Sequence, residues 1–255
     1  GGINAENPAG RGVIMEETLV LDNDGPGVSL VAFADYWSIT SCTIAGNAGD
    51  GVTYGGSKSP EGPDLRSRVQ FDLITHCTIT GNAGLGIRVD LPWGLEPGTS
   101  RIAENVVTMN AGGGVRINSQ GGDEYADLLM ESLTIADNGG NGLEISMDRP
   151  ADLVDLTIAY NSGVAIDPTG TDLLSIAGCN LYQNDGGDWT GDLADFQDVA
   201  ENTSTNPQFC DPWNGDYSVC PESELNRVTI DPGESGPVGC DETVTLTCTY
   251  DPIVG

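Results

Sequence analysis

The side chains with the most obvious potential for chemistry in this sequence are carboxylates. Asp and Glu number 39, against nine Lys and Arg, of which only Lys58 is a lysine, and the single histidine is His76. The formal net charge is −30. A polyanion of this density repels phosphate backbones and anionic membrane surfaces, so we expect no nucleic-acid partner. No apolar run approaches the roughly 20 residues of a membrane span, so we expect no membrane insertion.

Two short acidic turns carry the oxygen ligands that calcium prefers. Asp22 and Asp24 flank an asparagine, and Asp185 and Asp188 enclose two glycines. Neither turn follows the EF-hand loop pattern with its terminal Glu, and solvated corner residues would have the same composition. Calcium is the one cofactor candidate, and Asp22, Asp24, Asp185 and Asp188 are its candidate ligands.

Three longer segments, residues 55–68, 91–100 and 119–127, combine aromatic and acidic side chains. Trp93 and Tyr125 can stack on sugar rings, and the acids beside them can hold a cation. The alternative is that these two aromatic residues only cover an edge of the core. The candidate carbohydrate-binding residues are Trp93, Tyr125, Arg88, Arg116, Asp90 and Glu124.

The elements that must position these residues follow from a repeat built on asparagine. It recurs at gaps of 24, 35, 28, 28, 23 and 23 residues, at Asn23, Asn47, Asn82, Asn110, Asn138, Asn161 and Asn184. The positions eight before, three before and five after each asparagine are apolar in every copy. This pattern indicates strands on both sides of the asparagine and a third strand further upstream. It predicts three strands per coil, stacked over about seven or eight turns around an aliphatic core.

We expect the recurring asparagine to occupy a tight bend between two strands, in the left-handed backbone region that Asn tolerates. Stacked asparagine side chains can also hydrogen-bond to the backbone and to one another between coils. Glycines two and four residues later, such as Gly49 and Gly51, favour the same corner.

The repeats resemble those of right-handed parallel β-helix proteins, the pectate-lyase-like superfamily, over residues 10–195. The fold class we expect is therefore all-β, a right-handed parallel β-helix that spans residues 1–200. The resemblance selects no function, because this scaffold hosts lyases, hydrolases, adhesins and structural proteins.

The C-terminal part of the chain differs from the repeats. Residues 206–220 carry an N-P-x-F-C-D-P…G-D-Y pattern that resembles the closing segment of secreted bacterial β-helix proteins. We expect residues 201–255 to form the last coil and a Cys-rich cap or tail over the open end of the core. An uncapped end would be an open sheet edge and an aggregation hazard.

The seven cysteines fall into two groups. Cys42, Cys77 and Cys179 share one inward column, five residues before the asparagine, and we expect buried thiols there. The other four suggest two disulfides with three connectivities open, and they are Cys210, Cys220, Cys240 and Cys248. A zinc site is the rival, although a close C-x-x-C pair is missing.

The disulfides predict an extracellular, cell-surface or periplasmic location. The chain begins with Gly1 rather than Met, which fits a mature secreted chain or a piece of a longer protein.

Motifs for polysaccharide cleavage are faint. His76 lacks the Gly-His-Gly setting of polygalacturonase-like enzymes, and Val115-Arg116-Ile117-Asn118 is a weak match to their Arg-Ile-Lys. With 39 acids, some carboxylate pair meets the spacing for glycoside hydrolysis by chance. Arg88 and Arg116 share an outward column with Glu144 next to them, so we expect Arg116 to pair with Glu144 rather than serve as a lyase base.

The sequence favours a secreted, acidic, non-catalytic β-helix with a structural, surface-adhesive or filament-forming role, whose partner is a second copy joined end to end. The alternative is a polysaccharide lyase, a glycoside hydrolase or a carbohydrate-binding module that meets an extracellular glycan through the loop flank. The net charge of −30 disfavours anionic substrates unless Ca²⁺ bridges them.

Overall fold

The computed structural model describes most of the 255-residue chain. The described residues are 2–6, 13–31, 37–55, 71–91, 98–119, 126–147, 150–169, 174–221, 223 and 225. The chain divides into two compact units, residues 1–204 and 205–255.

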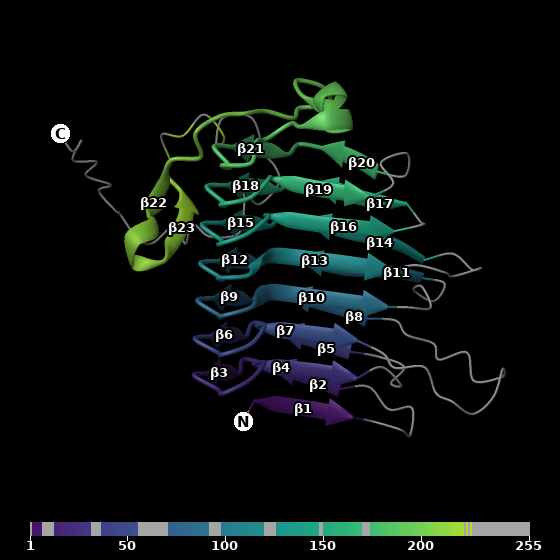
Figure 1. Cartoon of the computed structure of the whole chain (residues 1–255), viewed down its shortest axis with the longest axis vertical. Helices are drawn as coiled ribbons and strands as arrows, with labels where there is room; N and C mark the ends of the chain where they lie inside the picture. The colour runs from purple at the N-terminus through teal and green to yellow at the C-terminus, as the bar shows by residue number, and fades with distance from the viewer. Residues whose placement is uncertain are drawn as a thin grey trace. The chain divides into compact units, whose positions relative to one another are not determined.

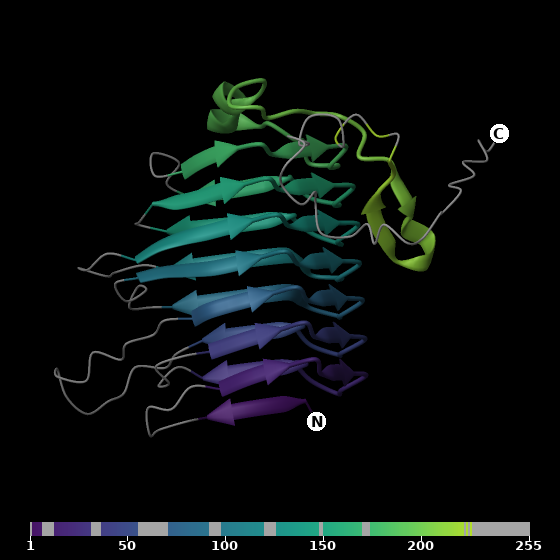
Figure 2. The same ribbon diagram turned by 180° about the vertical axis from the view of Figure 1, so that it is seen from behind.

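The first unit is a right-handed parallel β-helix with three parallel sheets of seven strands each (Figure 1). Each sheet pairs every third strand of the chain, so one coil contributes one strand to each sheet. Figure 2 shows the same stack from behind, with the coils in colour order from purple to green. The expected fold class and number of turns are confirmed.

The strand bounds follow the sheets. Sheet A contains β1 (Ile3–Glu6), β4 (Val28–Val31), β7 (Val52–Gly55), β10 (Leu85–Leu91), β13 (Gly113–Ser119), β16 (Leu143–Met147) and β19 (Ile166–Thr169). Sheet B contains β2 (Val13–Glu16), β5 (Trp37–Thr40), β8 (Phe71–Thr75), β11 (Gly98–Ala103), β14 (Ala126–Glu131), β17 (Ala151–Val154) and β20 (Leu174–Ala177). Sheet C contains β3 (Leu19–Leu21), β6 (Thr43–Ala45), β9 (Thr78–Thr80), β12 (Val106–Thr108), β15 (Thr134–Ala136), β18 (Thr157–Ala159) and β21 (Asn180–Tyr182).

The three predicted apolar columns form the core, one on the inner face of each sheet. In sheet C, for example, Ile79 pairs with Ile44 on one side and Val107 on the other, and all three are fully buried. The columns eight before and five after the asparagine lie in sheets B and A, respectively. Because alternate side chains point inward, a column of aliphatic residues is what a solenoid core requires of its sequence.

The recurring asparagines form a hydrogen-bonded ladder inside the corner between sheets C and A. The Oδ1 of Asn138 accepts from the backbone N–H of Asn110 at 3.0 Å and from its Nδ2 at 3.0 Å. In turn, the Nδ2 of Asn138 donates to Asn161 Oδ1 at 2.9 Å and to the carbonyl of Val107 at 3.0 Å. The same pattern joins the asparagines from Asn23 to Asn184, so the expected coil-to-coil stacking is confirmed.

The expectation that asparagine itself adopts a positive φ is wrong. The left-handed residue is the one before it, for example Gly46 at 67°, Met109 at 54° and Tyr160 at 59°. The reason is that the asparagine must point its amide into the ladder, so the preceding residue makes the turn. That residue belongs to no single type, which shows that the turn is imposed by the coil.

The glycine four residues after the asparagine is required by close approach of the next coil. A Cβ at Gly86 would lie 2.3 Å from Val107 Cγ1 and 2.8 Å from Asn110 Nδ2. Both distances are too short for any side chain, so Gly86 keeps the ladder and the core of the following coil in place.

The ladder ends at a carboxylate. Asp188 Oδ1 accepts from the backbone N–H of Asn184 at 3.0 Å and from its Nδ2 at 2.7 Å, as a further asparagine would. Beyond it, the 3₁₀ helix η2 (Gly191–Phe196) buries Leu193 against the core, with Phe196 packed beside it. Leu193 and Phe196 therefore cover the core next to the end of the ladder.

The second unit contains an antiparallel hairpin. Strand β22 (Phe209–Asp211) pairs with β23 (Asp216–Val219), and the 3₁₀ turn η3 (Pro212–Asn214) joins them. The rings of Phe209 and Tyr217 meet edge to face with their centroids 5.2 Å apart.

We predict that Asn138→Ala lowers the free energy of unfolding by about 3 kcal/mol, because two buried N–H groups of Asn110 lose their acceptor. Asn23→Ala at the half-buried end of the ladder is the matched control and should cost about 1 kcal/mol. Urea denaturation followed by circular dichroism measures both. Equal losses would contradict the ladder's role.

Candidate functional site

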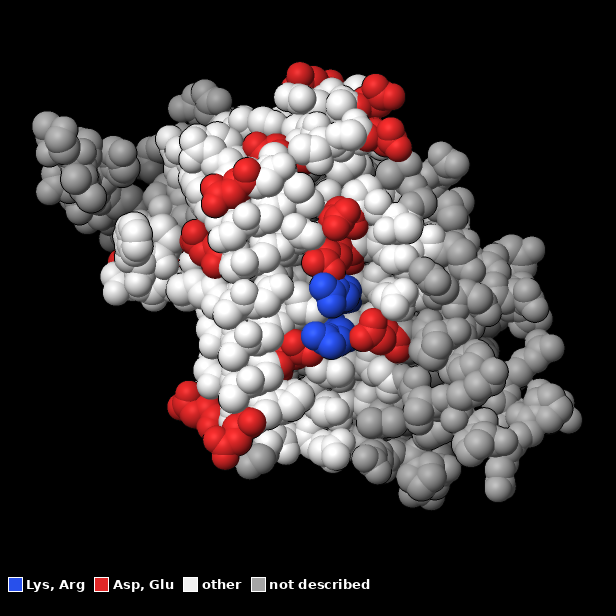
Figure 3. Space-filling view, in the orientation of Figure 1, with Lys and Arg blue, Asp and Glu red and all other residues white. Residues whose placement is uncertain are grey.

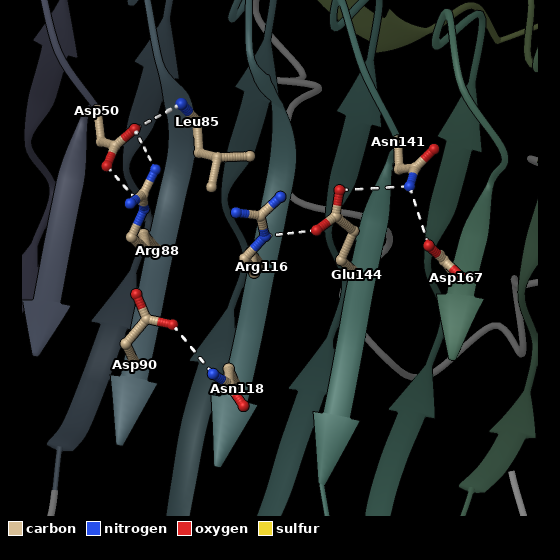
Figure 4. A network of polar contacts seen from close by, with 9 residues as sticks. All are labelled: Asp50, Leu85, Arg88, Asp90, Arg116, Asn118, Asn141, Glu144 and Asp167. Atoms are coloured by element: carbon tan, nitrogen blue, oxygen red, sulfur yellow. Dashed lines mark hydrogen bonds and ion pairs between the residues drawn. The ribbon is translucent and has the colours of Figure 1, made fainter. Parts of the chain in front are cut away.

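A polar network on the outer face of sheet A comprises the nine residues labelled in Figure 4, of which Leu85 contributes its backbone N–H, and also Thr53. The register of β7, β10, β13, β16 and β19 places its central column in line: Thr53, Arg88, Arg116, Glu144 and Asp167. In Figure 3 this face shows a blue patch flanked by red. The predicted outward column of Arg88, Arg116 and Glu144 is therefore confirmed.

Asp50 anchors one end of the network. It is 9% exposed, and its carboxylate lies 2.9 Å from the Nε of Arg88. The same carboxylate accepts from the backbone N–H of Leu85 at 2.8 Å and from Thr53 Oγ1 at 3.2 Å. Sequence reasoning missed Asp50. The signal was a polar residue three positions after the ladder asparagine. Asn141 occupies the same position in a later coil, and its Oδ1 likewise accepts from a backbone N–H of the next coil, that of Val164, at 3.0 Å.

Arg116 and Glu144 form the second ion pair, as predicted. Glu144 Oε1 also accepts from Asn141 Nδ2 at 3.3 Å, and that amide reaches Asp167 Oδ2 at 3.2 Å. The hydrogen bond with Glu144 raises the pKa of the Arg116 guanidinium, and the charges of Asp90 and Asp50 act in the same direction. Arg116 is therefore held in its charged form.

Asp90 completes the described part of the network. It faces Asn118 across the sheet, and Asn118 Nδ2 donates to Asp90 Oδ1 at 3.4 Å. Of the six predicted carbohydrate-binding residues, the structure thus brings together Arg88, Arg116 and Asp90. Trp93, Glu124 and Tyr125 lie outside the described residues.

The network is better suited to holding coils together than to proton transfer. Each arginine bonds a carboxylate from a neighbouring coil. An arginine that acts as a base must first lose its own proton, and a bound carboxylate opposes that loss. Four carboxylates surround two guanidiniums, so the face stays acidic. Its remaining capacity is to accept hydrogen bonds from hydroxyl groups or to attract cations.

A second cluster of charges lies on sheet B and at its corner with sheet C. Arg101 forms an ion pair with Glu131 of the next coil, and the His76 imidazole contacts the Glu104 carboxylate of the next coil. Arg101 also reaches Glu104 at 3.7 Å. Sequence reasoning missed this cluster. Its signal was that His76 and Glu104 both stand six residues before a ladder asparagine.

The candidate calcium ligands do not gather around one point in the described residues. Among these residues no group of three or more His, Cys, Asp or Glu could hold a metal ion. Asp22 and Asp185 are exposed corner residues, and Asp188 is engaged with the ladder. Asp22 also fills the space beside Gly46, where a Cβ would lie 2.3 Å from its Oδ1.

The three inward cysteines are buried, as expected. Cys42, Cys77 and Cys179 are buried free thiols, and burial raises the pKa of Cys77 and of Cys179 to about 12. In the second unit, the Sγ atoms of Cys210 and Cys220 lie 2.8 Å apart across the hairpin. Cys240 and Cys248 lie outside the described residues.

Comparison with protein-family models, with curated proteins and with solved structures finds no match to this chain. The fold assignment rests on the strand pairing itself. Over the described ranges, the structure contains no helix long and apolar enough to cross a membrane.

We predict that Asp155→Asn raises the urea midpoint at neutral pH. Burial, followed by the charges of Glu201 and Glu131, raises the pKa of Asp155 above 3.8. Its protonated form therefore stabilises the fold at low pH, and that contribution is lost as the pH rises through the folded pKa. The gain from Asp155→Asn should fade below pH 3.8 and shrink in a Glu201→Gln background. A gain that does not depend on pH would contradict this account.

We also predict that Cys210 and Cys220 form a disulfide in the purified protein under oxidising conditions, because their sulfur atoms are already adjacent. Mass spectrometry of non-reduced peptides detects the link. Cys42, Cys77 and Cys179 should react with a thiol reagent only after denaturation, which serves as the internal control. Rapid labelling of Cys210 without reductant would count against the link.

Proposed function

We propose that this chain is an extracellular, non-catalytic β-helix that serves as a structural or surface-adhesive scaffold. The observation that carries the proposal is the pairing of Arg88 and Arg116 with carboxylates of neighbouring coils. The two arginines on the outer face of sheet A, which could otherwise take part in catalysis, instead join neighbouring coils through ion pairs.

The electrostatics of Arg116 oppose a lyase mechanism that uses this residue as its base. An arginine base must lose a proton, and Glu144 raises the pKa of Arg116 instead. Arg88 is bound by Asp50 in a similar way, with its Nη2 3.4 Å from Asp50 Oδ1. Both contacts favour the scaffold over the enzyme.

The end of the ladder bears on the kind of scaffold. Within the first unit, Asp188 terminates the asparagine stack and Leu193 is buried over the last coil. This closure favours a discrete module over a filament that grows by adding coils at that end. We therefore place adhesion and structural support ahead of filament formation.

Membership in the pectate-lyase-like superfamily and a secreted location are part of the same proposal. Three parallel sheets with a buried asparagine stack support the first, and the adjacent sulfurs of Cys210 and Cys220 support the second.

A carbohydrate-active role through the loop flank remains the second candidate. The acidic network supports it, because Asp90, Asn118 and Asp167 present hydrogen-bonding groups on the outer face of sheet A. Such groups suit neutral sugars, whereas the four carboxylates repel anionic ones.

A polysaccharide panel separates the two candidates. We expect no release of reducing or unsaturated sugars from neutral or anionic polysaccharides, with or without added Ca²⁺, and retention of labelled protein on cell surfaces or insoluble glycans. Sugar release by the wild type that is lost in Arg116→Gln but kept in Ser175→Ala, on the outer face of sheet B, would overturn the scaffold.

A further inference from the structure

Trp213 is unusual because its side chain is 94% exposed. An indole carries about 150–250 Å² of largely apolar surface, and tryptophan is buried on average or found at interfaces. Trp189 in the first unit follows that rule, at 9% exposed. A fully exposed indole therefore calls for a reason, and the local structure supplies one.

The turn that carries Trp213 is braced from several sides. Pro212 starts η3, and Gly215 ends it in the left-handed region with φ 84° and donates its N–H to the carbonyl of Pro212 at 3.1 Å. The edge-to-face pair of Phe209 and Tyr217 supports the two strands at its base. A fixed backbone lowers the ordering cost of binding a ligand, so that mainly the two side-chain torsions of Trp213 remain to be fixed.

Polar residues flank Trp213 on both sides in the hairpin sequence. Asn214 Nδ2 donates to Asp211 Oδ2 at 2.6 Å, and Asp216 Oδ1 accepts from the N–H of Ser218 at 3.0 Å. Asp211 and Asp216 are direct partners across the hairpin. Each carboxylate has two oxygens and about four lone-pair directions, so both retain capacity for further donors.

The charge around the turn restricts the partner. In the described part of the second unit, residues 205–221, 223 and 225, the charged side chains are those of Asp211 and Asp216. This segment repels nucleic acids, anionic lipids and uronic acids. An exposed indole that shares its hairpin with two carboxylate acceptors instead suits a molecule with a C–H face and hydroxyl donors, such as a neutral sugar.

We propose that residues 211–216 form a binding site for a neutral saccharide, with one pyranose ring stacked on Trp213 and its hydroxyls donating to Asp211 and Asp216. The inference rests on the surface-adhesive function proposed above and names one of its contacts. The site belongs to the hairpin of the second unit and shares no residue with the network on sheet A.

Isothermal titration with neutral oligosaccharides of β-1,4-glucose, xylose and mannose tests the site on the full chain, with oligogalacturonate as the anionic comparison. At least one neutral sugar should bind, and oligogalacturonate should not. Trp213→Ala should weaken binding about tenfold or more, as loss of a central aromatic contact does. Trp213→Phe, which keeps a ring, should weaken it less.

Leu19→Ala is the matched control, since it removes an exposed apolar side chain (69%) from the first unit and should leave affinity unchanged. Absence of binding to every neutral sugar, or binding that survives Trp213→Ala, would overturn the site. Self-association that is lost in Trp213→Ala, without sugar binding, would identify a protein contact and also overturn it. The sugar-release and cell-adhesion assays of the wild type test the scaffold separately.

Discussion

The whole first unit depends on one interaction, the stack of buried asparagine amides between sheets C and A. Each amide bonds a backbone N–H and a side chain of a neighbouring coil, so it fixes the height and rotation of one coil on another. Aliphatic columns alone would allow coils to slide, because hydrophobic contact has little directionality. The buried amide removes that freedom, since a shifted coil would leave polar groups unpaired.

The features that could be predicted from the sequence are those that recur in every coil because the residue is buried there. Columns such as Ile44, Ile79 and Val107 are visible because these inner positions hold buried apolar side chains in every coil. The left-handed corner was misplaced by one residue, because Gly46, Met109 and Tyr160 share no chemistry and the coil path selects their φ.

The site was less predictable than the fold. Arg116 and Glu144 could be paired from the repeat, since they occupy the same position in adjacent coils. Asp50 and Arg88 lie 38 positions apart, and the segment between them includes an insertion. Their contact therefore depends on the register in which the chain rejoins the stack after the insertion. The cluster of His76 and Glu104 was missed for a different reason. This corner position holds residues of several types, so only the shared spacing of six residues before the ladder asparagine could have paired His76 with Glu104.

The asparagine stack, which ends at Asp188, has a net dipole along the axis of the first unit. At Asn138, for example, one N–H of the amide donates to Asn161 Oδ1 of the following coil, and the other donates to the carbonyl of Val107 in the preceding coil. The bonds between asparagine side chains all run in the same direction, from Nδ2 to the Oδ1 of the following coil, so their small dipoles add along the axis. The positive end lies at Asn184, where the Asp188 carboxylate is bound. This is the arrangement of an acid at the amino end of an α-helix, transferred to side chains. The two ends of the stack are thus chemically different, and a coil or partner suited to one would be mismatched to the other.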